Sequence, residues 1–133
     1  MGLKLFKPKD TITLGKRGEK LAAEYLKNKG LRIIEFNFKN SFGKQLGELD
    51  IIAKEKDCFV FVEVKTRFAL NTTVVVPEEN INRNKLHKLT KIINFYIKKN
   101  NLWDFPYRID AISILVDKNT DQYRIKHLEN IFF

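Results

Sequence analysis

Two acidic residues and a lysine lie in neighbouring stretches that otherwise have the composition of β-strands. Asp50 belongs to residues 47–53, and Glu63 and Lys65 belong to residues 59–67. Both stretches are rich in β-branched and aromatic residues, and the polar segment between them is short enough for a hairpin turn. Carboxylates are ligands for hard divalent cations such as Mg²⁺. The pattern is therefore compatible with a metal site at a hairpin.

The spacing of the charges predicts which of them face each other. A hairpin that turns on residues 56–57 places Asp50 directly opposite Glu63. It also places Glu48 opposite Lys65. The Cβ atoms of Asp50 and Glu63 then lie about 5 Å apart, and like charges opposed on a sheet destabilise it. We expect a cation between them, which is either Lys65 or a bound divalent metal.

The second stretch has the pattern of a strand that is covered on both faces. Val60, Val62 and Val64 share one face, and Phe59 and Phe61 share the other. The alternative interpretation is that both strands are exposed and that their charges are incidental. Burial on both faces argues against that alternative, because unpaired charges are costly in an apolar environment.

Composition limits the classes of protein to consider. The 133 residues include 25 Lys and Arg against 16 Asp and Glu, a net charge of +9 that suits nucleic acid or simply a solvated basic surface. The length predicts a single domain over residues 1–133. Cys58 is the only cysteine, which excludes a disulfide framework. We see no signal peptide or membrane span, so we expect a cytoplasmic protein with no membrane partner.

Hydrophobic periodicity predicts two helices and five strands. The helices cover residues 14–29, with Gly30 as the stop signal, and residues 84–100. The strands cover residues 31–38, 47–53, 59–67, 107–116 and 122–128. This order, α-β-β-β-α-β-β, predicts an α/β fold with a mixed sheet of about five strands, in which a helix crosses between parallel third and fourth strands. Residues 1–12 form a basic N-terminal arm, and residues 131–133 should return to the core.

Further expectations concern single side chains. In residues 31–38, Ile34, Phe36 and Phe38 have the same parity and should share one face. In the second helix, four residues should face inward: Leu86, Leu89, Ile93 and Ile97. We expect Asp110 to be a structural partner of Lys65 or Arg108 rather than a metal ligand.

The order of an acid, then an acid and a lysine two residues apart, resembles the PD-(D/E)XK nuclease motif, although no proline precedes Asp50. From about residue 14 to 116 the chain resembles the YraN family, small bacterial proteins that are similar to archaeal Holliday-junction resolvases. The matching segments are Gly15-Lys-Arg-Gly-Glu19, Ala22-Ala-Glu-Tyr-Leu26, Gly30, Gly47-Glu-Leu-Asp-Ile-Ile-Ala53, Phe61-Val-Glu-Val-Lys-Thr-Arg67, Pro77 with Glu79, and Lys85. One departure is Val75, near a position where the family has glycine.

The resemblance implies a restriction-endonuclease-like fold and metal-dependent hydrolysis of phosphodiester bonds in DNA. Branched or recombination DNA is one candidate substrate, and the resemblance leaves linear ends, nicks and RNA open. It assigns catalysis to Asp50, Glu63 and Lys65, and an Mg²⁺ or Mn²⁺ site to Asp50, Glu63 and Glu19, with Glu48 in a supporting position. Four residues are expected to contact nucleic acid: Lys16, Arg17, Arg67 and Lys85. Symmetric resolvases act in pairs, so a homodimer is a further expectation. The alternatives are a non-catalytic nucleic-acid-binding module with the same fold and a protein-interaction subunit.

Overall fold

A computed structural model describes residues 13–69 and 83–131 of the chain. The predictions for the arm of residues 1–12, for residues 70–82 with Val75, Pro77 and Glu79, and for residues 132–133 lie outside this part. Within it, Ile131 returns to the sheet as predicted, because its N–H donates to the Ile109 carbonyl at 2.7 Å. None of the described helices is long and apolar enough to cross a membrane.

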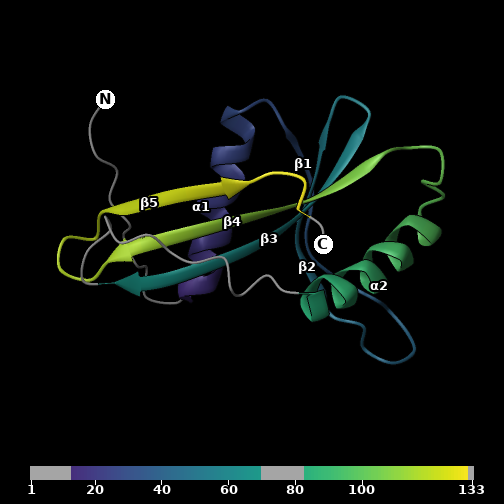
Figure 1. Cartoon of the computed structure of the whole chain (residues 1–133), viewed down its shortest axis with the longest axis horizontal. Helices are drawn as coiled ribbons and strands as arrows, with labels where there is room; N and C mark the ends of the chain where they lie inside the picture. The colour runs from purple at the N-terminus through teal and green to yellow at the C-terminus, as the bar shows by residue number, and fades with distance from the viewer. Residues whose placement is uncertain (1–12, 70–82, 132–133) are drawn as a thin grey trace.

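A five-stranded mixed sheet forms the centre of the molecule (Figure 1). The chain runs through α1 (Leu14–Asn28), β1 (Arg32–Lys39), β2 (Glu48–Glu55), β3 (Cys58–Ala69), α2 (Arg83–Lys99), β4 (Tyr107–Asp117) and β5 (Tyr123–Leu128). The strands lie in the order β1-β2-β3-β4-β5, with β3 and β4 parallel and the other pairs antiparallel. The predicted order of elements and the mixed sheet are confirmed, and both are consistent with a nuclease-like fold.

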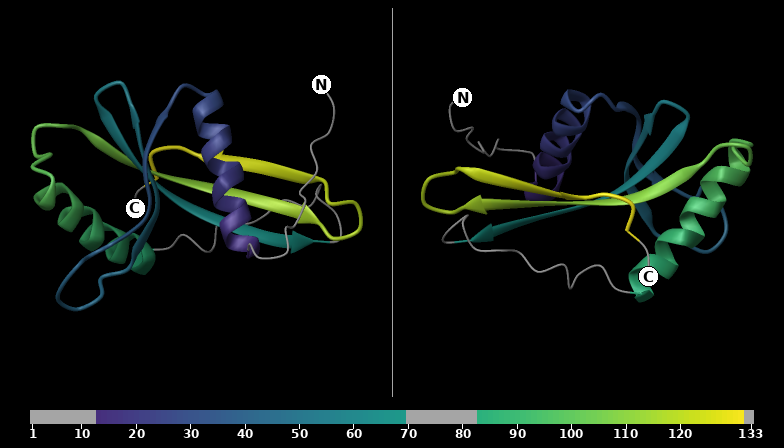
Figure 2. Two further views of the ribbon diagram at one scale, coloured as in Figure 1. Left: turned by 180° about the vertical axis from the view of Figure 1, so that it is seen from behind. Right: turned by 45° about the horizontal axis from the view of Figure 1, so that its top comes forward.

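The two helices cover opposite faces of the sheet (Figures 1 and 2). Val60 and Val62 of β3 belong to the apolar cluster beneath α1, whereas Phe59 and Phe61 belong to the cluster beneath α2. The prediction of a strand covered on both faces is therefore confirmed. The inward face of α2 is also as predicted, since all four expected residues are buried: Leu86, Leu89, Ile93 and Ile97.

Local sequence explains where α1 begins and ends. The Thr13 hydroxyl accepts a hydrogen bond from the Lys16 N–H at 3.2 Å, which satisfies one of the free donors of the first turn. At the other end, Gly30 has a φ of +98°, and the Leu31 N–H donates to the Leu26 carbonyl. Glycine adopts this left-handed conformation without steric cost. The predicted stop at Gly30 is confirmed.

The prediction for the first strand is wrong in one respect. The β1–β2 register shifts between Ile33 and Glu35, a bulge or irregularity that separates Ile34 from the alternation of the later residues. Asn37, between Phe36 and Phe38, has a φ of +53°, which is not a strand conformation and interrupts the alternation there. Phe38 is buried with 4% of its surface exposed, but Ile34 is 38% and Phe36 43% exposed. These three residues therefore do not share one buried face.

The sheet divides where β2 and β3 separate. Their ladder extends from the hairpin turn to the pair Ile51 and Val62, while β3 continues alongside β4 as far as Ala69. Beyond the ladder, α1 approaches β3 so closely that Gly18 lies against Thr66. The absence of a side chain at Gly18 is thus a requirement of this helix–strand contact.

Replacing Gly18 with Ala should destabilise the protein by roughly 1–3 kcal/mol, because the new Cβ would overlap the Thr66 hydroxyl. The matched control is Gly15→Ala in the same helix, where no atom lies within 4 Å of the added Cβ. That change should stabilise by up to about 1 kcal/mol through helix propensity. Urea unfolding measures both effects, and equal effects of the two substitutions would contradict the close contact.

Candidate functional site

The β2–β3 hairpin has the register predicted from sequence. It turns at residues 56–57, and the pair Ile51 and Val62 continues the ladder so that the next positions are Asp50 and Glu63. There the backbone pairing stops, and Asp50 Oδ2 instead accepts a hydrogen bond from the Val64 N–H at 2.8 Å. The two carboxylates therefore flank the point where the strands separate.

Three acidic residues from two elements converge at this point. Glu19 of α1, Glu48 of β2 and Asp50 of β2 each offer a carboxylate oxygen, and these oxygens lie within 4.8 Å of one another. All three residues are partly buried. Carboxylate oxygens at this spacing could hold a divalent cation. Of the predicted metal ligands, the structure brings Glu19 and Asp50 together, and the third member of the group is Glu48.

Asn37 connects two members of this group, and sequence reasoning missed it. Its side-chain amide donates to Glu19 Oε1 at 3.0 Å and to Glu48 Oε1 at 2.7 Å. Its carbonyl oxygen accepts from Lys16 Nζ at 2.6 Å. Asn37 has a φ of +53°, a conformation in which asparagine is enriched. The signal in the sequence was an asparagine between two phenylalanines in a predicted strand.

Glu63 lies on the opposite side of the strand separation and has a different partner. Its Oε1 forms an ion pair with Lys85 Nζ of α2 at 2.7 Å, and its side chain is only 11% exposed. The cation beside Glu63 is therefore Lys85. Lys65, one of the two cations expected from sequence, does not form this pair. Lys65 follows two residues later on β3, and its side chain is exposed.

The crowding of carboxylates affects the protonation of Asp50. Burial raises its pKa, and the charges of Glu63, Glu19 and Glu48 raise it further, whereas the hydrogen bond from Val64 lowers it. The result is a pKa of about 7, well above the ordinary value of 3.8. Perturbed carboxylates of this kind are frequent at functional sites.

A cleft of about 650 Å³ opens over these groups. Glu48, Asp50 and Glu63 line one side of it, and the first turns of α2 contribute Lys85 and Lys88 to the other. The other residues that line it are Leu46, Gly47, Asn84, Leu89 and Ile92. The cleft thus combines acidic groups at the sheet with cationic groups on the helix.

The remaining residues predicted to contact nucleic acid lie on α1 and β3. Lys16 is exposed and reaches the acidic group, with its Nζ 3.6 Å from Glu19 Oε1. Arg17 on α1 and Arg67 on β3 are half-buried, and neither of them lines the cleft.

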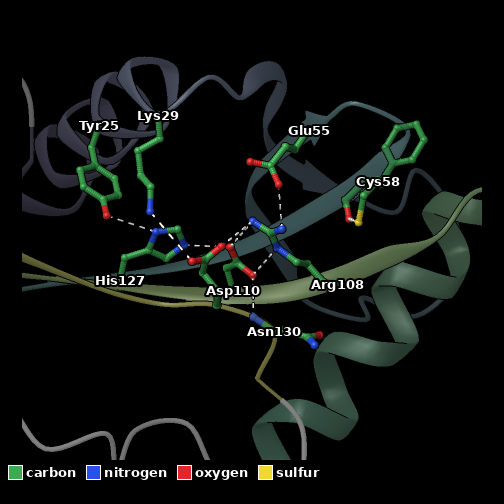
Figure 3. Close-up of polar contacts among 10 residues, drawn as sticks. Tyr25, Lys29, Glu55, Cys58, Arg108, Asp110, His127 and Asn130 are labelled. Carbon is green, nitrogen blue, oxygen red and sulfur yellow. Dashed lines mark hydrogen bonds and ion pairs between the residues drawn. The ribbon is translucent and has the colours of Figure 1, made fainter.

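Asp110 is the centre of a separate polar cluster (Figure 3). It is fully buried and accepts hydrogen bonds from the Arg108 guanidinium, from His127 Nε2 at 2.8 Å and from the Asn130 N–H at 2.9 Å. Burial alone raises the pKa of Asp110, but these hydrogen bonds outweigh it and hold the pKa below its usual range. The expected partnership with Arg108 is confirmed, and the alternative with Lys65 is not.

Comparison with known proteins assigns the chain to a family. Residues 18–114 match the model of "Uncharacterised protein family UPF0102". The chain belongs to the UPF0102 family. A UPF0102 protein of Thermodesulfovibrio yellowstonii is 42% identical over 122 residues, which are 92% of this chain and 97% of the relative. A UPF0102 protein of Campylobacter fetus is 38% identical over the whole of both chains, and one of Clostridium botulinum is 40% identical over 90% of this chain and 93% of the relative.

The raised pKa of Asp50 predicts how the stability of the metal-free protein depends on pH. A carboxyl whose pKa is higher in the folded state contributes stability at low pH, and this contribution is lost as pH rises from about 4 to about 7. The loss amounts to at most about 4 kcal/mol. Asp50→Asn should therefore become more stable relative to wild type as pH rises through this window. Urea unfolding in EDTA measures the difference.

The control for this prediction is Asp57→Asn, because Asp57 is exposed in the hairpin turn. Its stability relative to wild type should change little over the same pH range. If the Asp50→Asn and Asp57→Asn differences follow the same course with pH, Asp50 does not carry the proposed charge repulsion.

Proposed function

We propose that this protein is a metal-dependent endonuclease that hydrolyses phosphodiester bonds in DNA, with Mg²⁺ or Mn²⁺ as its cofactor. The observation that carries the proposal is the group of Glu19, Glu48 and Asp50, whose oxygens lie within 4.8 Å of one another. Two of these acids line a cleft that also contains lysines. The resemblance of Asp50, Glu63 and Lys65 to the acid, acid-X-lysine motif supports the same reaction.

The donor set fits a hard divalent ion. Mg²⁺ and Mn²⁺ prefer carboxylate oxygens, and a site of three carboxylates has the charge to hold either. Burial raises the pKa of Asp50 to about 7, and the charges of Glu63, Glu19 and Glu48 add to the rise, so a cation bound beside Asp50 would oppose it. Glu19, Glu48 and Asp50 would hold the ion. A divalent ion supplies Lewis acidity toward a phosphodiester oxygen and neutralises the charge that develops there during hydrolysis.

The side chains around this group have separate tasks in the proposed reaction. Lys65 donates to the scissile phosphate and stabilises the negative charge of the transition state. Lys85, which pairs with Glu63 at 2.7 Å and lines the cleft, contacts a phosphate of the incoming strand. Val64 holds Asp50 in place through its N–H.

Basic residues near the cleft position the DNA. We propose that Lys85 and Lys88 on α2 contact backbone phosphates, together with Lys16, Arg17 and Arg67. Such contacts fix the orientation of the strand and weaken with salt, but they carry no base specificity. Because one site cuts one strand, cutting both strands of a branched DNA symmetrically requires two copies of the chain.

The proposal predicts cleavage of labelled DNA in Mg²⁺ or Mn²⁺. The substrates are a four-way junction, a flap, a linear duplex and a single strand. Asp50→Asn and Lys65→Ala should each lower the rate by roughly 100-fold or more, since Asp50 would hold the metal ion and Lys65 would stabilise the charge on the reacting phosphate. Lys118→Ala, an exposed lysine in the β4–β5 turn, should cut like wild type.

Two results would contradict the proposed reaction. If wild type binds these DNAs but cuts none of them in either metal, the alternative of a non-catalytic binding module takes its place. If wild type and Asp50→Asn cut equally, the nuclease activity comes from a contaminant or from another site.

The role of Asn37 predicts a second experiment that does not depend on cleavage. Asn37→Gly removes the amide that links Glu19 and Glu48 but keeps a residue that accepts a positive φ. Groups that orient metal ligands typically contribute 10- to 100-fold to affinity, so we expect roughly 10-fold weaker Mn²⁺ binding by calorimetry.

Asn101→Gly is the matched control, because Asn101 has a φ of +54° and follows α2. This variant should bind Mn²⁺ like wild type. Equal Mn²⁺ affinity of the Asn37 and Asn101 variants would show that Asn37 does not position the ligands.

A further inference from the structure

The connection between β1 and β2 presents an aromatic side chain to solvent. Phe42 is 74% exposed, the largest exposed fraction among the large apolar residues of the part that the structure describes. Figures 1 and 2 show this connection projecting alongside α2. Single exposed apolar residues are common on protein surfaces, so a function for Phe42 depends on what surrounds its ring.

The loop that carries Phe42 is held by one buried side chain. Asn40 is only 9% exposed, and its amide donates to the carbonyls of Phe42 at 2.9 Å and Lys44 at 2.8 Å. Its side-chain oxygen accepts from the Leu46 N–H at 3.0 Å. Gly43, with a φ of +78°, allows the turn that these bonds close. Phe42 is therefore exposed on a loop that these hydrogen bonds already order. Binding of a ligand to Phe42 then costs little conformational entropy of the loop.

The same loop contributes to the candidate active site. Leu46 and Gly47 line the cleft together with Asp50. The ring of Phe42 makes an edge contact with Phe95 of α2, at a centroid distance of 5.7 Å and an angle of 64°. Phe95 lies one turn beyond Ile92, which also lines the cleft. Phe42 thus stands beside the cleft, supported by α2.

Lysines flank Phe42 in the sequence, and another lies on the neighbouring helix. Lys39 and Lys44, at the two ends of its segment, are exposed, and Lys39 Nζ lies 3.5 Å from Glu48 Oε2. Lys99 of α2 lies over the ring of Phe38, with its Nζ 5.5 Å from the centroid, and Phe38 in turn contacts Phe95. An exposed aromatic ring among lysines is the combination that binds single-stranded nucleic acid, in which bases stack on the ring and phosphates meet the cations.

We propose that Phe42 is a stacking platform for an unpaired base of the DNA strand that enters the cleft. This inference rests on the proposed function and specifies its substrate class as DNA with a branch, flap or single-stranded segment. In a continuous duplex both faces of each base are already stacked within the helix, so Phe42 has no partner there. At a branch or in a single strand, a base face is free to stack.

Binding of fluorescein-labelled DNA, measured by anisotropy in Ca²⁺, tests the proposal. Phe42→Ala should weaken binding of a flap, a four-way junction and a single strand by roughly 5- to 100-fold. Binding of a blunt duplex of equal length should change by less than about twofold. Phe42→Trp should retain the affinity of wild type. Trp103→Ala is the matched control, since Trp103 is 65% exposed and lies in the α2–β4 connection.

A direct readout of stacking accompanies the affinities. Wild type should quench or shift the fluorescence of 2-aminopurine placed at the unpaired position, and Phe42→Ala should not. Because Phe42 is exposed and loses only its contact with Phe95, the variant should remain folded at the assay temperature, and a thermal unfolding curve therefore separates a binding effect from a folding effect.

The outcomes separate this inference from the proposed function. If wild type binds and cuts DNA but Phe42→Ala binds all four substrates like wild type, or loses affinity equally for all, the stacking platform is wrong and the nuclease stands. If wild type binds none of these DNAs, both are wrong. If Phe42→Ala instead converts a dimer to a monomer in sedimentation and leaves DNA affinity unchanged, the surface belongs to a second copy of the chain.

Discussion

The hydrogen bond from the Val64 N–H to Asp50 Oδ2 controls the arrangement of the molecule around its cleft. If the β2–β3 ladder continued, Leu49 would face Val64 and this N–H would pair with backbone. Because the Asp50 carboxylate accepts the bond instead, the strands separate without leaving a buried donor unpaired. The separation admits α1, in which Gly18 permits contact with β3 and Glu19 reaches Asp50. One side chain therefore both ends the ladder and belongs to the acidic group.

The charges of the site are arranged so that each acid except Asp50 has a cation or an amide beside it. Lys85 pairs with Glu63 at 2.7 Å, and Lys39 lies 3.5 Å from Glu48. Glu19 receives the Asn37 amide. Among the residues that the structure describes, Asp50 has only the Val64 N–H as a hydrogen-bond donor, and it is the group whose pKa rises to about 7. The electrostatic strain is thus concentrated on the residue at the centre, where a cation would relieve most of it.

Sequence predicted the elements, the register of the hairpin and the partnership of Asp110 with Arg108, but not the partners of Glu48 and Glu63. The turn expected at residues 56–57 places Asp50 opposite Glu63, because the position of the turn fixes the register of a hairpin. The acidic group contains Glu48 where Glu63 was expected, and Glu63 pairs with Lys85 instead. Both arrangements depend on how α1 and α2 dock on the sheet. Periodicity describes one element at a time and contains no information on docking. The shift in β1 was equally inaccessible, since no hydrophobic pattern marks an inserted residue.

The acidic group is costly to the folded protein, and this cost is itself an argument for a ligand. Three carboxylates within 4.8 Å repel one another, and the pKa of Asp50 shows that its ionisation opposes folding at neutral pH. Replacing one acid by its amide would remove the repulsion at little steric change. A cation that binds only the folded state returns stability by mass action. Destabilising groups in an otherwise consistent fold are expected at functional sites. Here the Asn37 amide donates to both Glu19 and Glu48, and so keeps two of the carboxylates close together in spite of their repulsion.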